Sequence, residues 1–297
     1  MTIHIVTDST SDIPEDRRAD LDIAVIPLYL TVNGQTYQDN IDLSRREFYR
    51  MLPNTNPNPT TATPSPDQFI STYEKAADNG ATAIFSIHIS ESLSATVDSA
   101  RTAAKQFTRV PVTVIDSGNL SMAEGLIVLK AAQAAKEGKS VVEIQAMIDS
   151  VIPRTHAYAK LDTIDYLKRG GRMSSIQHSV VSILGIKPIL KMNNHVSKME
   201  IARTKSKAFE RILNVALENF PYAEMFGITH ANVPDQVEEL VGRLRKIMPG
   251  MPEPMVAEVT PTLGTHVGPG ALCVNWIESE AHHAEEKKGL RKWIPEF

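Results

Sequence analysis

The first half of the sequence alternates short β-branched runs with longer segments of helical period, and this alternation limits the fold more than any other feature. Strands are expected at residues 3–7, 24–31, 82–87 and 112–115. Apolar spacing of three and four residues predicts helices at 93–107, 121–136 and 141–151. Parallel strands joined by crossover helices have this order, so the prediction is an α/β fold whose first sheet is mainly parallel and flanked by helices.

Capping residues and one turn refine this prediction. Ser44 and Ser65 each precede a glutamate or glutamine by three residues, the pattern of a capping box, and Pro66 suits the first helical position. Asn33 and Gly34 lie between strand-forming residues and predict a hairpin. We therefore expect the hairpin to interrupt the parallel order and to make the first sheet mixed.

A second α/β unit is expected after Pro153 and Arg154, where the order of elements restarts. The 297 residues suffice for two domains. The expected elements are strands at 156–161, 187–192, 195–201 and 226–229, with helices near Asp165 and at 208–220 and 235–248. The predicted division is an N-terminal α/β lobe at 1–153, a C-terminal α/β lobe at 154–280 and a charged tail at 281–297.

Charge and cysteine content narrow the class of protein. The net charge is −4, from 31 basic and 35 acidic residues, which gives no electrostatic footprint for nucleic acid or an anionic membrane. The single cysteine, Cys273, cannot form an intramolecular disulfide. The strand-like N-terminus is not expected to be a signal peptide, and the apolar run 23–32 is too short to span a bilayer. We expect a cytoplasmic protein without a transmembrane segment.

Formal catalytic and metal-binding motifs do not occur in the sequence. It contains no HExxH, CxxC, GxSxG or strand-linked GxGxxG pattern. The run 138–140 resembles the end of a phosphate loop, but Gln133 replaces the leading glycine, so a helix C-cap is the better interpretation. The histidines do not group at metal-ligand spacing outside the charged tail. We expect neither a metal nor a cofactor.

Two polar segments precede expected helices and are candidates for anion binding. The proline- and asparagine-rich stretch 53–64 is either a flexible linker or a loop held beside free helix N–H groups. The hydroxyl-rich segment 90–96 follows a strand, where ligands bind in open α/β sheets. Ordinary N-capping by Ser92 or Ser94 explains the second segment equally well.

Two further loops carry candidate residues. Segment 264–270 contains three glycines and a proline, which predict a tight loop that lets backbone approach a ligand; a plain turn with an exposed His266 is the alternative. The loop at 8–12 has acidic ends that repel anions. For it, capping is the favoured interpretation.

Six segments, in their order along the chain, resemble the DegV family, whose members are similar to the fatty-acid-binding subunits of bacterial fatty acid kinase. The resemblance implies two α/β lobes with an acyl chain buried between or within them. It extends to about Ser279. The matching segments are residues 7–12, 61–66, 90–96, 167–172, 202–204 and 264–270.

By this resemblance, Thr61, Ser94 and His266 hold the carboxylate of the fatty acid. Hydroxyl and imidazole groups can donate hydrogen bonds to a carboxylate, and a protonated His266 would add positive charge. The family signature Thr-Ser-Gln-Pro-Ser is altered here, since Ala62 and Thr63 occupy its second and third positions. Contacts from those two side chains are therefore not carried over.

The resemblance also implies a function without catalysis. The chain would bind a long-chain fatty acid and present it to a separate ATP-dependent kinase subunit, which forms the acyl phosphate. Arg203, and with it Arg169 and Arg172, would dock the partner or contact phosphate. Without the resemblance, all three are typical solvated surface charges.

Two other functions fit the same residues. Ser94 as nucleophile and His266 as base would make a hydrolase or acyltransferase. Helix N-termini could instead bind another small anion, such as a phosphorylated metabolite. Acyl length and unsaturation depend on the shape of the cavity, which the sequence does not give, and neither the kinase partner nor the oligomeric state can be read from it.

Overall fold

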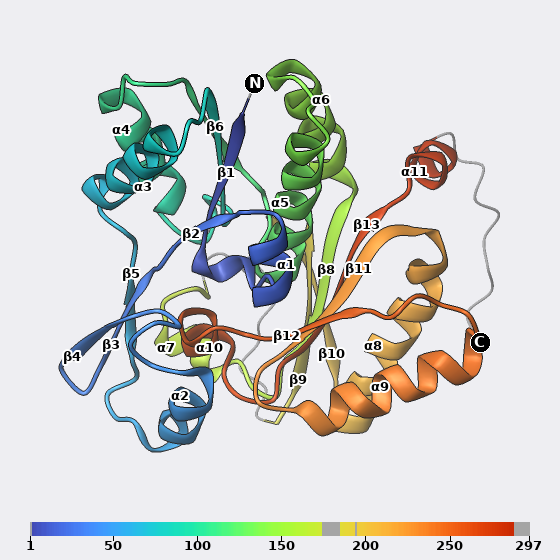
Figure 1. The fold of residues 1–297 in the computed structure, drawn as a ribbon. Coiled ribbons are helices and arrows are strands. Elements are labelled where there is room, and N and C mark those ends of the chain that lie inside the picture. The colour runs from blue at the N-terminus through green and yellow to red at the C-terminus, as the bar shows by residue number, and fades with distance from the viewer. Residues whose placement is uncertain (1, 174–184, 194, 288–297) are drawn as a thin grey trace.

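The computed structural model describes residues 2–173, 185–193 and 195–287, which form a mixed α/β fold (Figure 1). Its first sheet has four strands, and every pairing between neighbours is parallel. In spatial order these strands are β2 (Ala24–Ile26), β1 (Ile3–Asp8), β6 (Ala83–His88) and β7 (Val112–Asp116). The expected parallel sheet is confirmed.

The other two sheets are mostly antiparallel. A six-stranded sheet has the order β10 (His195–Ala202), β9 (Lys187–Asn193), β8 (Thr155–Lys160), β13 (Leu272–Glu278), β11 (Ala223–His230) and β12 (Met255–Glu258). Only its β11–β12 pairing is parallel. A small antiparallel sheet has the order β4 (Gln35–Gln38), β3 (Tyr29–Val32) and β5 (Thr60–Ala62).

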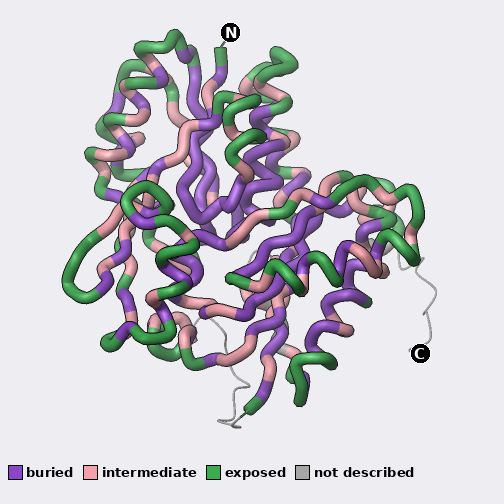
Figure 2. The backbone as a smooth tube through the Cα atoms, turned by 60° about the horizontal axis from the view of Figure 1, so that its bottom comes forward, coloured by how far each residue is buried: buried purple, intermediate pink, exposed green. Residues whose placement is uncertain are grey.

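Helices and sheets alternate in layers. Helices α3 (Pro66–Asp78) and α4 (Thr96–Gln106) cover one face of the parallel sheet, and α8 (Lys205–Asn219) and α9 (Pro234–Ile247) cover the outer face of the six-stranded sheet (Figure 1). Helix α5 (Ser121–Lys136) lies between the two sheets. Figure 2 shows buried backbone through this centre. Because α5 packs against sheets on both sides, it is apolar around its circumference instead of along one stripe.

Shorter elements connect these layers. The remaining helices are α1 (Glu15–Asp20), α2 (Arg45–Met51), α6 (Val141–Val151), α7 (Asp165–Arg169), α10 (Pro261–Val267) and α11 (Glu280–Lys287). The 3-10 turns are η1 (Ser9–Ser11), η2 (Leu52–Asn54), η3 (Ile152–Arg154) and η4 (Phe220–Tyr222).

The strand expected at 24–31 is divided at Pro27. This proline has no N–H for a ladder, and the next N–H, of Leu28, donates to Ser9 Oγ at 3.1 Å. The chain therefore leaves the parallel sheet as β2 and enters the small sheet as β3. The hairpin predicted at Asn33 and Gly34 does form, with both residues at positive φ, but it belongs to that separate sheet. The expectation of a mixed first sheet was wrong.

Other local predictions had mixed outcomes. The helices capped by Ser44 and Ser65 and the C-cap glycine, Gly138 with φ 77°, are confirmed. The helix expected from residue 93 begins instead at Thr96, because residues 90–95 form a turn. Strands β12 and β13 were not predicted.

The predicted lobe boundary falls in η3. Strands of the parallel sheet precede it and strands of the six-stranded sheet follow it, while the division into lobes itself stays a prediction. Strands β9 and β10 pair as the expected hairpin, although Asn194 lies outside the described residues. In the tail, α11 forms, and residues 288–297 lie outside the described chain.

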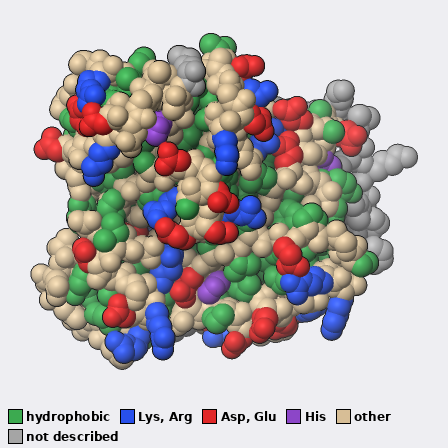
Figure 3. Space-filling view, viewed as in Figure 1, with side chains coloured by type: hydrophobic (Ala, Val, Ile, Leu, Met, Phe, Trp, Pro, Cys, Tyr) green, Lys and Arg blue, Asp and Glu red, His purple; other side chains and the backbone are tan. Residues whose placement is uncertain are grey.

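The molecular surface has no dominant charge on the face seen in Figure 3, where acidic and basic side chains are interspersed. Within the described residues, no helix combines the length and the apolar character needed to cross a membrane.

Candidate functional site

A largely apolar cavity lies where the loops after β1 and β6 meet α5, α7, α10 and the inner face of the six-stranded sheet. The empty space at this site, which includes a part open to solvent, is about 1090 Å³. The apolar lining includes Leu93, Leu120, Leu161, Leu190, Met192 and Leu263. Cavities of this kind bind ligands that are mostly apolar and carry a few polar groups.

Small side chains on the sheet provide the space. Ala157 and Ala159 are two residues apart on β8, so they face the same side, and Cys273 pairs with Ala159 on β13. Larger side chains at these positions would fill the cavity. Burial raises the pKa of Cys273 to about 12, so its thiol is protonated and unreactive at neutral pH.

One part of the cavity wall is polar, and the three predicted head-group residues lie there. Thr61 Oγ1 is 2.9 Å from His266 Nε2, although the two residues are 205 positions apart. Ser94 Oγ is 2.8 Å from Thr96 Oγ1. All three predicted residues line the same cavity and are half-buried. Their role as carboxylate ligands stays a prediction.

Thr61 is placed by a strand that the sequence did not indicate. Residues 60–62 form β5, an edge strand in which Thr61 pairs with Leu30. The end of the proline-rich stretch is thus part of a sheet and is not a flexible linker. Ala62, which departs from the family signature, is exposed, and neither it nor Thr63 is among the described residues that line the cavity.

His266 lies on α10 and not in the tight loop that was expected. The helix continues to Val267, and the chain turns only at Gly268, with φ 71°. Thr260 and Pro261 were the overlooked signal, since proline at the first helical position favours a helix start. Gly264 serves close packing instead of a turn, because a Cβ there would lie 2.7 Å from the hydroxyl of Tyr49.

The His266 imidazole is neutral at neutral pH. Burial, with a contribution from the charge of Arg172, lowers its pKa to about 4. The positive charge that a protonated ring would add is therefore absent at pH 7. Its Nδ1 is buried without a hydrogen-bond partner in the described part of the chain. Gly170 packs directly on this atom, and a Cβ at that position would collide with it.

Of the three candidate arginines, Arg172 is the one found among the described residues that line the cavity. Arg172 lines the cavity, with Nη1 2.9 Å from Gly170 O and Nε 3.4 Å from Leu93 O. Arg169 is exposed beside the ring of Tyr166, and Arg203 is exposed between β10 and α8. The cavity-lining residues that the structure describes include neither of these two.

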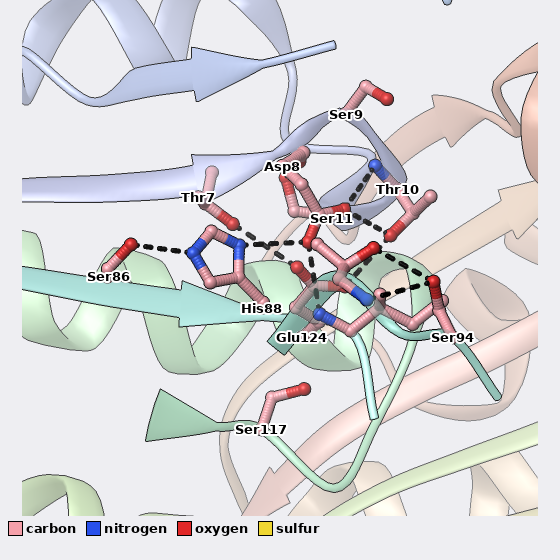
Figure 4. A network of polar contacts seen from close by, with 12 residues as sticks. Thr7, Asp8, Ser9, Thr10, Ser11, Ser86, His88, Ser94, Ser117 and Glu124 are labelled. Atoms are coloured by element: carbon pink, nitrogen blue, oxygen red, sulfur yellow. Dashed lines mark hydrogen bonds and ion pairs between the residues drawn. The ribbon is translucent and has the colours of Figure 1, made fainter. Parts of the chain in front are cut away.

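A buried polar network supports the cavity from the parallel sheet (Figure 4). The Asp8 carboxylate accepts hydrogen bonds from His88 Nδ1 at 3.1 Å, from Ile89 N at 3.1 Å and from Thr10 N at 3.0 Å. Burial alone would raise the pKa of Asp8, but the hydrogen bond and charge of His88, with the other donors, hold it below its ordinary value. Asp8 thereby joins Thr10, which lines the cavity, to the start of the loop that carries Ser94.

Glu124 of α5 completes this network as a neutral acid. Its two oxygens lie 3.2 Å from Thr7 Oγ1 and 3.3 Å from Thr10 Oγ1. Burial, with the negative charge of Asp8 as the next cause, raises the pKa of Glu124 well above its ordinary value. The folded protein therefore holds a proton on Glu124 that the unfolded chain loses near pH 4.5.

We expect Glu124→Gln to weaken the pH dependence of stability. Because the folded pKa is raised, the stability linked to Glu124 is fully present below pH 4.5 and is lost as pH rises, by at most about 1.4 kcal/mol per pH unit. An uncharged amide removes this loss. Urea unfolding of both proteins from pH 5 to pH 8 measures it, and equal slopes of stability against pH would show that Glu124 is ionised in the folded state.

The sequence was compared with known families and structures. The family model described as the DegV family of uncharacterised proteins matches residues 2–279. The chain belongs to the DegV family. A DegV domain-containing protein of Streptomyces coelicolor is 35% identical over 274 residues, which are 92% of this chain and 97% of that protein. Protein DegV of Bacillus subtilis is 33% identical over 282 residues, 93% of this chain and 99% of that protein.

Solved DegV-family structures share the whole fold. A Thermus thermophilus member, described by its fatty acid binding, superposes with a TM-score of 0.84 at 32% identity, covering 94% of this chain and 100% of the other. DegV of Bacillus subtilis, described as a fatty acid binding protein, superposes with a TM-score of 0.85 at 32% identity and the same coverage. In the described part of this DegV-family chain, no three His, Cys, Asp or Glu side chains are arranged to hold a metal ion.

Proposed function

We propose that this chain binds one long-chain fatty acid in the cavity, with the acyl tail along Ala157 and Ala159 and the carboxylate at Thr61, Ser94 and His266. The observation that carries this proposal is a largely apolar cavity whose wall brings a hydroxyl and an imidazole within 2.9 Å of each other. The Thermus and Bacillus family members of the same fold, described as binding fatty acids, support it.

A neutral His266 recognises the head group through Thr61. If Nε2 carries the proton, it donates to Thr61 Oγ1, and the Thr61 hydroxyl is free to donate to the carboxylate. Ser94 adds a second hydroxyl from the opposite loop. Hydrogen bonds to an ionised acceptor are stronger than neutral ones, so these donors compensate for burying the carboxylate.

The acyl tail supplies most of the affinity. Burial contributes about 0.8 kcal/mol for each methylene, from which the ordering of ligand and protein is subtracted. The head-group contacts then fix which end of the fatty acid lies at Thr61. This division of roles predicts weak discrimination among short apolar ligands and tight binding of long ones.

Mass spectrometry of lipids extracted after gentle purification tests the proposal. A stoichiometric long-chain fatty acid supports it. A protein that carries no lipid and also fails to bind added oleate contradicts it, and a phosphorylated metabolite in its place would support binding of another anion.

The bound fatty acid is proposed to be presented to a separate ATP-dependent kinase subunit in the cytoplasm, which forms the acyl phosphate. The chain itself would then perform no catalysis. Arg172 lies at the cavity, where it can approach the head group, whereas Arg169 and Arg203 are exposed and available to a partner.

We expect Arg203→Ala to retain bound fatty acid and to lower acyl phosphate formation by about tenfold in an assay reconstituted with the kinase subunit. The physical reason is that Arg203 is exposed and outside the cavity lining, so its loss affects partner contact and not lipid binding. Unchanged phosphorylation would remove Arg203 from the docking surface. Loss of lipid would instead show a structural role.

The geometry does not favour a serine hydrolase. In the described chain, Ser94 Oγ pairs with Thr96 and His266 Nε2 pairs with Thr61, so the nucleophile–base hydrogen bond is not formed. A hydrolase histidine is also oriented by a third polar group, and His266 Nδ1 has no such partner among the described residues.

A further inference from the structure

Helix α10, which carries His266, does not cap its own N-terminus. Thr260 at the N-cap makes no side-chain hydrogen bond to the helix, and Pro261 has no N–H. Two backbone N–H groups at this end of α10 bond to side chains from elsewhere in the chain. Asp39 Oδ1 accepts from Thr262 N at 3.0 Å, and Asp12 Oδ1 accepts from Thr260 N at 2.9 Å.

Both carboxyl groups are themselves fixed by second hydrogen bonds. Asp39 Oδ2 accepts from Ser9 Oγ at 2.7 Å, and Asp12 Oδ2 accepts from Ser121 Oγ at 2.6 Å. The two aspartates are 1% and 2% exposed. Their hydrogen bonds to α10 span 223 positions from Asp39 and 248 positions from Asp12. Through the second bonds, Asp39 joins α10 to the loop after β1 and Asp12 joins it to the start of α5.

His266 lies near the other end of this short helix, where its position depends on small distances. Its ring packs on Gly170 and is 2.9 Å from Thr61 Oγ1. A tilt that moves the ring by about 1 Å would break this hydrogen bond, since such bonds weaken beyond roughly 3.2 Å. The orientation of α10 thus decides whether the imidazole and the hydroxyl meet.

We propose that Asp39 and Asp12 form a clamp of two buried carboxyl groups that orients α10 and so positions His266 against Thr61 for recognition of the fatty acid head group. Asp39 is a positioning residue. It is not among the described residues that line the cavity, whereas Thr262, whose N–H donates to it, does line it. This inference rests on the proposed fatty acid site and extends it to residues outside the cavity.

A double-mutant cycle on oleate binding tests the clamp. Oleate is titrated calorimetrically, below its micelle concentration, into wild type, Asp39→Ala, His266→Ala and the double variant. If Asp39 acts through His266, Asp39→Ala weakens binding about tenfold in the wild-type background and less than twofold when His266 is absent. Equal losses in both backgrounds overturn the clamp.

The protonation state of the His266 ring gives a second readout, which general destabilisation of the protein does not change. Histidine NMR, with the His266 signal assigned by its loss in His266→Gln, follows the ring through a pH titration. Wild type should stay neutral above pH 5, because the His266 pKa is lowered to about 4. In Asp39→Ala the pKa should return toward about 6.5 as the ring leaves its buried contact. An unchanged pKa contradicts the clamp.

Three matched variants control for folding. Ser140→Ala removes the cap of α6, outside the cavity lining, and should lower Tm without changing the Kd for oleate. Asp39→Asn keeps an oxygen for the Thr262 N–H and should restore binding to within about threefold. Asp39→Ser is used in place of the alanine variant if that variant does not fold. Asp39 reaches Ser9 and Thr262 with two different oxygens, whereas serine offers one oxygen on a shorter side chain.

The outcome for His266→Ala separates this inference from the proposed function. Unchanged oleate binding in His266→Ala rejects the head-group assignment and the clamp with it. Weakened binding in His266→Ala combined with wild-type binding in Asp39→Ala rejects the clamp alone.

Discussion

Replacing Ala157 with phenylalanine should reduce fatty acid affinity by roughly two orders of magnitude while the protein stays folded. Ala157 lines the cavity from β8 and is 3% exposed. A phenyl ring there takes the place of about four methylenes of the ligand, which at about 0.8 kcal/mol each is near 3 kcal/mol, or roughly 150-fold in Kd. Titration with oleate measures this loss.

Stability distinguishes a blocked cavity from a damaged core. The ring of Ala157→Phe enters empty space, so Tm should be unchanged or higher, whereas overpacking a filled core costs about 1–3 kcal/mol. Val256→Phe is the matched control, because Val256 lies on β12 of the same sheet, is 41% exposed and is outside the described cavity lining. Wild-type affinity in folded Ala157→Phe would show that the acyl chain lies elsewhere.

Replacing Thr61 with valine should weaken oleate binding by about 10-fold to 100-fold. Valine keeps the shape of threonine and removes only the hydroxyl that joins His266 to the proposed carboxylate. A hydrogen bond to a charged group contributes about 1.5–3 kcal/mol, and the loss also leaves His266 Nε2 without its partner. Ser94→Ala should have an effect of similar size for the same reason.

Thr60→Val is the control for this substitution. Thr60 is the neighbouring residue of β5, is exposed and is outside the described lining, so its side chain is expected to point away from the cavity. The methyl ester of oleic acid adds a ligand control, because it lacks the carboxylate and should bind wild type and Thr61→Val alike. If both valine variants bind oleate like wild type, the carboxylate is not held at Thr61.

Local chemistry made part of this structure predictable. The β-branched runs became β1, β6 and β7, because the fit of such side chains to a strand is already visible within a short segment of sequence. Ser44 and Ser65 marked helix starts for the same reason. The break at Pro27 and the start of α10 at Pro261 were missed, although proline carries a local signal at both positions.

The sequence nominated candidate residues for the site but not their arrangement. Ordered motifs of the DegV family indicated Thr61, Ser94 and His266, and the structure places them on one cavity. The motifs could not show that Arg172 lines this cavity while Arg203 does not, because that depends on how loops from distant segments pack. Asp39 carried no sequence signal at all.

The sequence by itself determined the α/β class and the mainly parallel order of the first sheet, and its motifs nominated Thr61, Ser94 and His266 as candidate head-group residues, because hydrogen-bonding period, capping and motif order are properties of short segments. Only the tertiary structure decided that Thr61 meets His266 at 2.9 Å, that small side chains leave a cavity and that Asp39 caps α10. It also decided that His266 is neutral, with its pKa lowered to about 4. Desolvation and distance depend on residues that are hundreds of positions apart, so they exist only once the chain has packed.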